Sequence, residues 1–123
     1  MTPEQLRVTR IQSFIQLAKE ELQVSAAIRM AHRRQSAYFL QQAVEKALRG
    51  ILEVEGCVAG PMHSIRGLFD LLPAGHAFRV RFLDLEPLSA AATKYRYPTS
   101  KDTLADIDPE SLEALRLLAV EVI

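Results

Sequence analysis

The sequence has little of several residue types that carry recognisable chemistry. It contains a single cysteine, Cys57, and no tryptophan in 123 residues. An internal disulfide and a paired-cysteine metal site are therefore excluded. A lone thiol is typical of a reducing compartment, so we expect a cytoplasmic protein. No apolar run approaches the roughly 20 residues that a membrane-spanning helix needs. We therefore expect the chain to be soluble and not associated with a membrane.

The chain also lacks an excess of charge of either sign. Fifteen basic residues balance fifteen acidic ones, which argues against a dedicated non-specific nucleic-acid binder. Apolar residues make up 49% of the chain and charged residues 24%, as in an ordinary globular protein. A chain of this length can bury one core without a metal or a disulfide, so we expect one domain over residues 1–123.

Glycine and proline are scarce too, with five and six residues. Helical periodicity fills most of the remaining sequence, which predicts an all-α fold. We expect a single-domain up-and-down helical bundle of four to five helices.

The first predicted helix begins at Thr2, which can cap it, with Pro3 at the first helical position and Gln5 able to reach back to the cap. It could extend to about Met30, and the polar stretch 32–35 is the expected turn. The apolar residues three and four apart that define its inner face are Ile11, Phe14, Ile15, Ala18 and Leu22.

The second predicted helix has the strongest pattern and ends at Gly56. Its two apolar flanks predict either the centre of the bundle or part of a dimer seam with an uncovered apolar ridge. The main stripe consists of Ala37, Leu40, Val44, Ala47 and Ile51, and it is widened by Tyr38, Leu48 and Leu52.

Three more helices are predicted after a loop. A short one covers "SIRGLFDLL", a longer one spans Phe78 to Tyr95 with a kink at Pro87, and a last one starts at Asp108. The residues expected to face inward are Ile65, Leu68, Phe69, Leu72, Phe82, Leu85, Leu88, Ala92, Leu112, Leu115, Leu118 and Val122.

General catalytic motifs are missing. The sequence has no glycine-rich phosphate loop, and His32, His63 and His76 lack the spacing of metal ligands. No motif surrounds Cys57, so we interpret it as a bystander. We expect neither a metal nor a cofactor.

Residues 33–56 resemble the signature of HEPN domains, which are small helical domains named for higher eukaryotes and prokaryotes nucleotide-binding. The signature has an aromatic pair, a Gln-Ala-x-Glu-Lys-Ala-Leu-Lys-like run and a glycine. The matching residues are Tyr38, Phe39, Gln42, Ala43, Glu45, Lys46, Ala47, Leu48, Arg49 and Gly56. His63 and the sequence Arg96-Tyr97-Pro98 match later features, so the likeness spans about residues 11–120.

The polar residues of this run are the first candidate binding site. Gln42, Glu45, Lys46 and Arg49 are three and four residues apart and share one helix face, and Glu45 to Arg49 is a favourable ion-pair spacing. Either this face is solvated and carries intrahelical pairs, or Gln42 and Glu45 point into a cleft or a symmetric interface.

Many HEPN domains are ribonucleases with an arginine and a histidine that are separated by four to six residues, and two copies bring this motif together across a dimer interface. The histidine moves the proton of the attacking 2′-hydroxyl, and the arginine stabilises the phosphate charge. This motif is absent, because Lys101, Asp102 and Thr103 occupy the positions where Arg96 would need its histidine. A metal-independent ribonuclease toxin with a rearranged site, using His63 or His32, is the alternative interpretation.

HEPN proteins without the motif are often paired with a minimal nucleotidyltransferase. The resemblance therefore implies a non-catalytic homodimer that binds such a partner, as in toxin–antitoxin modules, with a nucleotide or RNA as a further ligand. The chain lacks the Gly-Ser and Asp-x-Asp pattern of the transferase itself, so the partner must be a separate polypeptide. A purely structural helical module is a third interpretation.

The sequence "KYRYP" is the second candidate site. Arg96 could bind a phosphate with its forked guanidinium, while Tyr95 or Tyr97 stacks on a base. Alternatively, the tyrosines cover the end of the bundle and Arg96 binds helix-terminal carbonyls.

Overall fold

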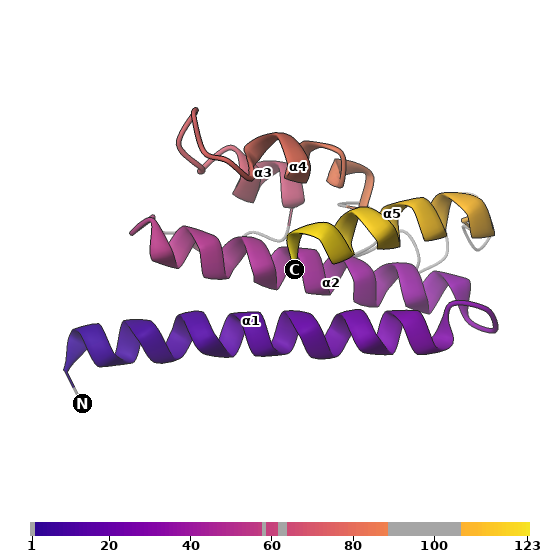
Figure 1. The fold of residues 1–123 in the computed structure, drawn as a ribbon, viewed down its shortest axis with the longest axis horizontal. Coiled ribbons are helices and arrows are strands. Elements are labelled where there is room, and N and C mark those ends of the chain that lie inside the picture. The colour runs from indigo at the N-terminus through magenta and orange to yellow at the C-terminus, as the bar shows by residue number, and fades with distance from the viewer. Residues whose placement is uncertain (1, 58, 62–63, 89–106) are drawn as a thin grey trace.

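The chain forms an all-α bundle in a computed structural model that describes residues 2–57, 59–61, 64–88 and 107–123 (Figure 1). These residues contain five helices and no strand, which confirms the predicted fold class. The helices are α1 (Pro3–Ile28), α2 (Arg33–Val54), α3 (Ile65–Phe69), α4 (Arg79–Leu83) and α5 (Pro109–Val122). Within the same residues, no helix is both long and apolar enough to cross a lipid bilayer.

Helix α1 starts with the predicted capping box. The Thr2 hydroxyl accepts a hydrogen bond from the Gln5 backbone N–H at 3.1 Å, and the Gln5 side chain accepts one from the Thr2 N–H at 2.7 Å. Of the predicted inner face only Ala18 is fully buried, and the other members are partly exposed. The reason is that α1 lies at one side of the molecule and packs mainly against α2 (Figure 1).

The turn between α1 and α2 lies earlier than predicted. Helix α1 ends at Ile28 and α2 begins at Arg33, so residues 29–32 form the turn and residues 33–35 already belong to α2. A buried contact explains the difference. Ser25 and Ser36 each donate a hydroxyl hydrogen to the other's backbone carbonyl, at 2.8 and 2.7 Å. Ser36 therefore has to lie inside α2, directly opposite Ser25.

Helix α2 is the centre of the bundle and lies between α1 and the layer formed by α3, α4 and α5 (Figure 1). Its main stripe is covered within one subunit: Ala37, Leu40, Val44 and Ala47 are at most 1% exposed, and Ile51 is partly buried against the core. The prediction of a central helix is confirmed. The alternative, an uncovered apolar ridge on this helix that a second copy must cover, is wrong.

The fourth predicted helix is much shorter than expected. Helix α4 ends at Leu83, and Glu86–Leu88 form a 3₁₀ turn instead of a continued α-helix. Pro87 accounts for this, because it lacks an N–H and disfavours helical geometry at the residue before it. Phe82, Leu85 and Leu88 are buried as predicted. The rest of that prediction, from residue 89 to Tyr95 and including Ala92, lies outside the described residues.

The two remaining helices follow the predicted patterns. Ser64 caps α3, whose inward residues Ile65, Leu68 and Phe69 are buried. The Asp108 carboxylate caps α5 by accepting hydrogen bonds from the Ser111 hydroxyl and backbone N–H, which lower the pKa of the carboxyl group. Leu72 and Leu112 are buried, while Leu115, Leu118 and Val122 are partly buried against the core.

Candidate functional site

The first candidate site lies on α2 and can be followed atom by atom. The second, Tyr95, Arg96 and Tyr97, lies outside the described residues, as does His63. The structure therefore gives the geometry of the first site alone, which consists of Gln42, Glu45, Lys46 and Arg49.

A line of side-chain hydrogen bonds runs along α2. The Gln42 amide donates to Gln41 Oε1 at 2.7 Å, and the Gln41 amide donates to Glu45 Oε2 at 3.1 Å. Arg49 Nε donates to Glu45 Oε1 at 3.3 Å. Gln41 is fully buried and Glu45 is only 4% exposed. The expectation of a solvated face is therefore wrong for Glu45, which is a buried acceptor in a polar network.

Lys46 belongs to a different contact, although it was predicted to share that face. Its ammonium group binds the Glu21 carboxylate of α1, so it joins the two long helices. Arg49 instead extends toward the segment that follows α2, where its Nη1 donates to the Gly60 carbonyl at 2.9 Å. The predicted residues thus divide between a helix–helix contact and a contact with the loop.

Arg49 also lines a surface hollow of about 480 Å³ between α1, the end of α2 and the loop that follows. We refer to it as the arginine hollow because three arginines take part in its wall. Its lining residues are Arg7, Arg10, Phe14, Arg49, Glu53, Gly56, Cys57, Ala59 and Gly60.

The floor of the arginine hollow is built by the C-terminus of α2. Gly56 has a φ of 73°, which favours glycine, and its N–H donates to the Glu53 carbonyl while the Cys57 N–H donates to the Leu52 carbonyl. This is the Schellman arrangement that ends many helices. Arg7 of α1 also donates to the carbonyls of Glu53 and Val54, at 3.1 and 2.6 Å, so the Glu53 carbonyl accepts two hydrogen bonds. A cation placed there also complements the negative end of the helix dipole.

The charges in the hollow favour an anion. Arg10 donates from Nε and Nη2 to one oxygen of Glu53, at 3.1 and 2.6 Å, and its side chain is 55% exposed. An exposed ion pair of this kind is worth at most about 1 kcal/mol, so a ligand can open it at little cost. The lining contains three guanidinium groups and one carboxylate, that of Glu53, which Arg10 binds. Arg7 also pairs with Glu4, and Arg49 with Glu45. The end of α2 opposes an anion only weakly because Arg7 covers it.

These groups match a phosphate-bearing ligand. Guanidinium groups bind phosphate oxygens through two parallel hydrogen bonds, and Arg10 and Arg49 approach the hollow from two different helices. Phe14 also belongs to the lining, and an aromatic side chain is a group on which a base can stack. The hollow could therefore hold a small phosphorylated molecule such as a nucleotide.

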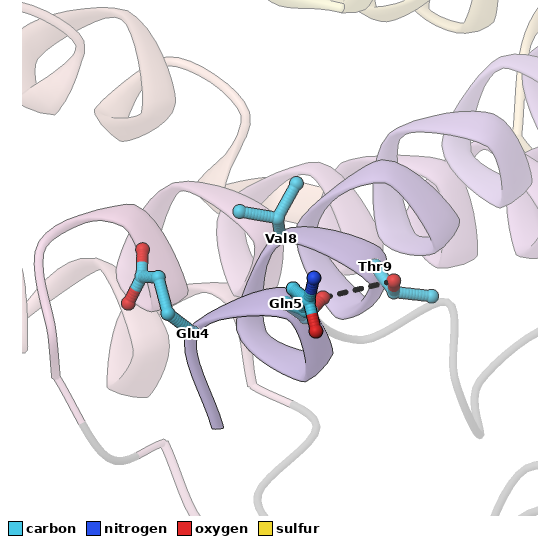
Figure 2. A pocket seen from close by; sticks show the side chains of 4 residues that line it. All are labelled: Glu4, Gln5, Val8 and Thr9. Carbon is cyan, nitrogen blue, oxygen red and sulfur yellow. Dashed lines mark hydrogen bonds between the residues drawn. The ribbon is translucent and has the colours of Figure 1, made fainter. Parts of the chain in front are cut away.

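A second hollow lies on the first turns of α1 and has a different character. It measures about 590 Å³ and is lined by Glu4, Gln5, Val8 and Thr9. Figure 2 shows that all four side chains come from the same helix, with Thr9 donating to the Gln5 carbonyl. Since no second element of the described residues supplies an opposing wall, we interpret it as a surface depression.

The described histidines offer no proton-transfer group beside the arginine hollow. His76 is held by both ring nitrogens: Nδ1 accepts from the Phe78 N–H at 3.2 Å, and Nε2 lies 3.1 Å from Glu55 Oε1. His32 stands at the N-cap position at the opposite end of α2, without a side-chain capping bond, about 30 Å away along a helix of this length. Over the described part of the chain, no cluster of three histidine, cysteine or acidic side chains could bind a metal.

The sequence matches the family model of the HEPN domain over residues 11–123. The chain belongs to the HEPN family. Searches of curated proteins and of solved structures gave no match.

In this HEPN domain the signature residues have separate structural tasks. The aromatic pair Tyr38 and Phe39 packs edge to face with ring centroids 5.5 Å apart. The polar run supplies the buried network, and Gly56 supplies the turn that ends α2. Arg49 connects these features to the arginine hollow.

Sequence reasoning missed the α1 side of the hollow. Arg7 and Arg10 are three residues apart on one helix and followed by Phe14, a pattern that predicts a shared face. Nothing in the sequence indicates that this face meets Arg49, because that depends on how α1 and α2 align.

Proposed function

We propose that this HEPN protein is a non-catalytic homodimer that binds a separate minimal nucleotidyltransferase, and that its arginine hollow holds the phosphate groups of a nucleotide. One observation supports the proposed binding of a nucleotide. The family run ends in Arg49, and the packing of α1 on α2 brings Arg49 into one hollow with Arg7 and Arg10.

A non-catalytic role is supported by the sequence and by the described histidines. The chain has no arginine that is separated from a following histidine by four to six residues. Both ring nitrogens of His76 are engaged, and His32 lies at the far end of α2. General acid–base cleavage of RNA needs an imidazole within hydrogen-bond reach of the 2′-hydroxyl, and none of these positions supplies one beside the three arginines.

The partner part of the proposal is carried by the family and by what the chain itself lacks. A minimal nucleotidyltransferase has Gly-Ser and Asp-x-Asp residues for its metal and phosphates, and this chain has neither pattern. Co-expression with the product of a neighbouring gene that encodes those residues should yield a stable complex on size-exclusion chromatography. If no such complex forms, this part of the proposal is abandoned.

The nucleotide part is tested by calorimetric titration of the purified protein with ATP and with adenosine. We expect ATP to bind and adenosine to bind at least tenfold more weakly, because the phosphates contact the arginines. Arg10→Ala should weaken ATP binding about 10- to 100-fold, the loss expected for one charge-assisted contact.

Arg116→Ala is the matched control, because Arg116 lies on α5 and pairs with Glu113 outside the hollow. Its ATP affinity should equal that of the wild type. Equal affinities for ATP and adenosine, or an Arg10→Ala variant that binds as well as the control, would remove the hollow from the proposal. Cleavage of RNA by the purified protein would contradict the non-catalytic assignment and favour the ribonuclease alternative.

A further inference from the structure

One face of α1, beside its contact with α2, carries a regular row of side chains that the described residues of the subunit leave exposed. Its members alternate four and three residues apart, the spacing by which helices interlock side chains in pairs. All are exposed, and the three large apolar ones, Leu6, Leu17 and Val24, are 46%, 42% and 40% exposed. The α1 seam consists of Leu6, Arg10, Ser13, Leu17, Glu20 and Val24.

The α1 seam is complementary to itself when the helix direction is reversed. If two copies cross at the level of residue 15, Leu6 meets Val24, Arg10 meets Glu20 and Ser13 meets Leu17. Each pairing occurs twice, as a two-fold axis requires. Apolar side chains thus face apolar ones, opposite charges face each other, and the large Leu17 faces the small Ser13.

We propose that the α1 seam is the homodimer interface and that it binds the same seam of a second copy in antiparallel orientation. This interface rests on the proposed homodimer and does not depend on the proposed binding of a nucleotide or a nucleotidyltransferase. It also replaces the α2 ridge as the dimer surface, because that ridge is covered inside the subunit.

Charge decides the orientation. A parallel pair would place Arg10 against Arg10 and Glu20 against Glu20, which is repulsive at both levels, whereas the antiparallel pair gains two attractive contacts. Arg10 binds Glu53 through Nε and Nη2, so those bonds leave its Nη1 to reach a second carboxylate. Gln16 donates to Glu20 at 2.9 Å and orients that carboxylate on the same helix.

A second copy also fits the position of α1. Figure 1 shows α1 along one side of the molecule with α2 as its main neighbour, and each residue of the α1 seam is exposed. Arg10 belongs both to the α1 seam and to the lining of the arginine hollow. The interface would therefore run along the rim of the hollow in each subunit.

The first test is a charge reversal at Glu20, which lies outside the arginine hollow. Glu20→Arg places an arginine opposite Arg10 at two symmetric points, so we expect the dimer dissociation constant from sedimentation equilibrium to rise at least tenfold. Gln12→Arg is the matched control, because it adds the same side chain at an exposed α1 position off the seam. Its dissociation constant should stay within twofold of the wild type, and circular dichroism should show that both variants fold.

The double variant Arg10→Glu/Glu20→Arg supplies the decisive comparison. It exchanges the two charges and restores opposite signs across the interface, so its dissociation constant should return to within about threefold of the wild type. A double variant as weak as Glu20→Arg alone overturns the Arg10–Glu20 contact between copies.

The register is tested by a spin label at Ala27, an exposed residue beside the seam, in a Cys57→Ser background. Antiparallel pairing about residue 15 separates the two Ala27 positions by about 36 Å along the helices, whereas parallel pairing leaves them about 10 Å apart. Double electron–electron resonance distinguishes these values, and the short distance overturns the proposal.

These results separate the interface from the proposed function. A wild-type protein that is monomeric at 100 µM overturns the interface, even if it binds ATP as proposed. A dimer that resists Glu20→Arg uses another surface, which also overturns it. A monomer whose α1 seam is protected from hydrogen exchange only in a complex with the nucleotidyltransferase assigns the face to that partner instead.

Discussion

Position 45 shows how one residue of the family run acts inside the protein. Glu45 is 4% exposed and accepts hydrogen bonds from Gln41 and Arg49. A buried carboxylate is costly unless such donors compensate for its lost hydration. We infer that Glu45 holds Arg49 in the orientation that faces the loop and the arginine hollow, and is a positioning residue.

Replacement of Glu45 should therefore lower the stability of the fold. Glu45→Ala leaves the Gln41 amide and the Arg49 guanidinium without this acceptor, and should lower the free energy of unfolding by about 2–4 kcal/mol in urea titrations. Glu45→Gln is the matched variant, because it keeps the shape and one acceptor oxygen, and should cost about half as much. Equal stability of Glu45→Ala and the wild type would show that the network contributes nothing.

At the scale of elements, the pairing of α1 with α2 depends on small side chains at their crossing points. Ser25 and Ser36 exchange hydroxyl-to-carbonyl hydrogen bonds where both are fully buried. Farther along, a Cβ added at Gly50 would come within 3.3 Å of the Phe14 Cβ. Both contacts show that the two backbones lie close together, and this closeness sets the alignment that brings Arg7 and Arg10 to the end of α2.

The serine pair provides a prediction at this scale. Ser36→Ala removes one buried hydrogen bond and should lower the free energy of unfolding by about 1 kcal/mol, whereas Ser36→Val adds overpacking and should cost about 2–3 kcal/mol. Gln35→Ala, at the exposed neighbouring position, is the control and should change stability by less than about 0.5 kcal/mol. Equal values for the three variants in chemical denaturation would mean that this crossing point is not closely packed.

At the scale of the whole molecule, burial is distributed unevenly over the two long helices. Helix α2 contributes residues such as Leu40, Leu48 and Leu52, all fully buried, while the only fully buried residues of α1 are Ala18 and Ser25. Stability should follow burial, because an amide exchanges only when the structure around it opens.

Amide hydrogen exchange should therefore be slower in α2 than in the first turns of α1. We expect the α2 amides around Leu40 to Leu52 to exchange at the rate of global unfolding, and residues 3–10 of α1 to exchange at least tenfold faster through local fraying. The measurement is hydrogen–deuterium exchange followed by NMR, under dilute conditions in which the protein is monomeric. Slower exchange in residues 3–10 than in α2 would contradict the described arrangement of the core.

Much of the fold was predictable because helix propensity, capping and apolar periodicity act over a few residues. The capping residues Thr2 and Asp108 correctly predicted where α1 and α5 begin, and the apolar stripe correctly predicted that α2 is the centre of the bundle. The predictions failed where the outcome depended on distant contacts. The turn between α1 and α2 lies earlier than the polar stretch 32–35 indicates, because Ser36 of α2 packs opposite Ser25 of α1. The fourth helix is shorter than its apolar periodicity predicts, because Pro87 disfavours helical geometry.

The sequence by itself determined that this is an all-α HEPN chain without the ribonuclease motif, because family signature and motif spacing are properties of sequence order alone. Only the tertiary structure decided that Glu45 is buried, that the α2 ridge is covered, and that Arg7 and Arg10 join Arg49 in one hollow. The physical reason is that burial and convergence depend on how α1 and α2 align, and that alignment is set by close contacts between residues far apart in the chain.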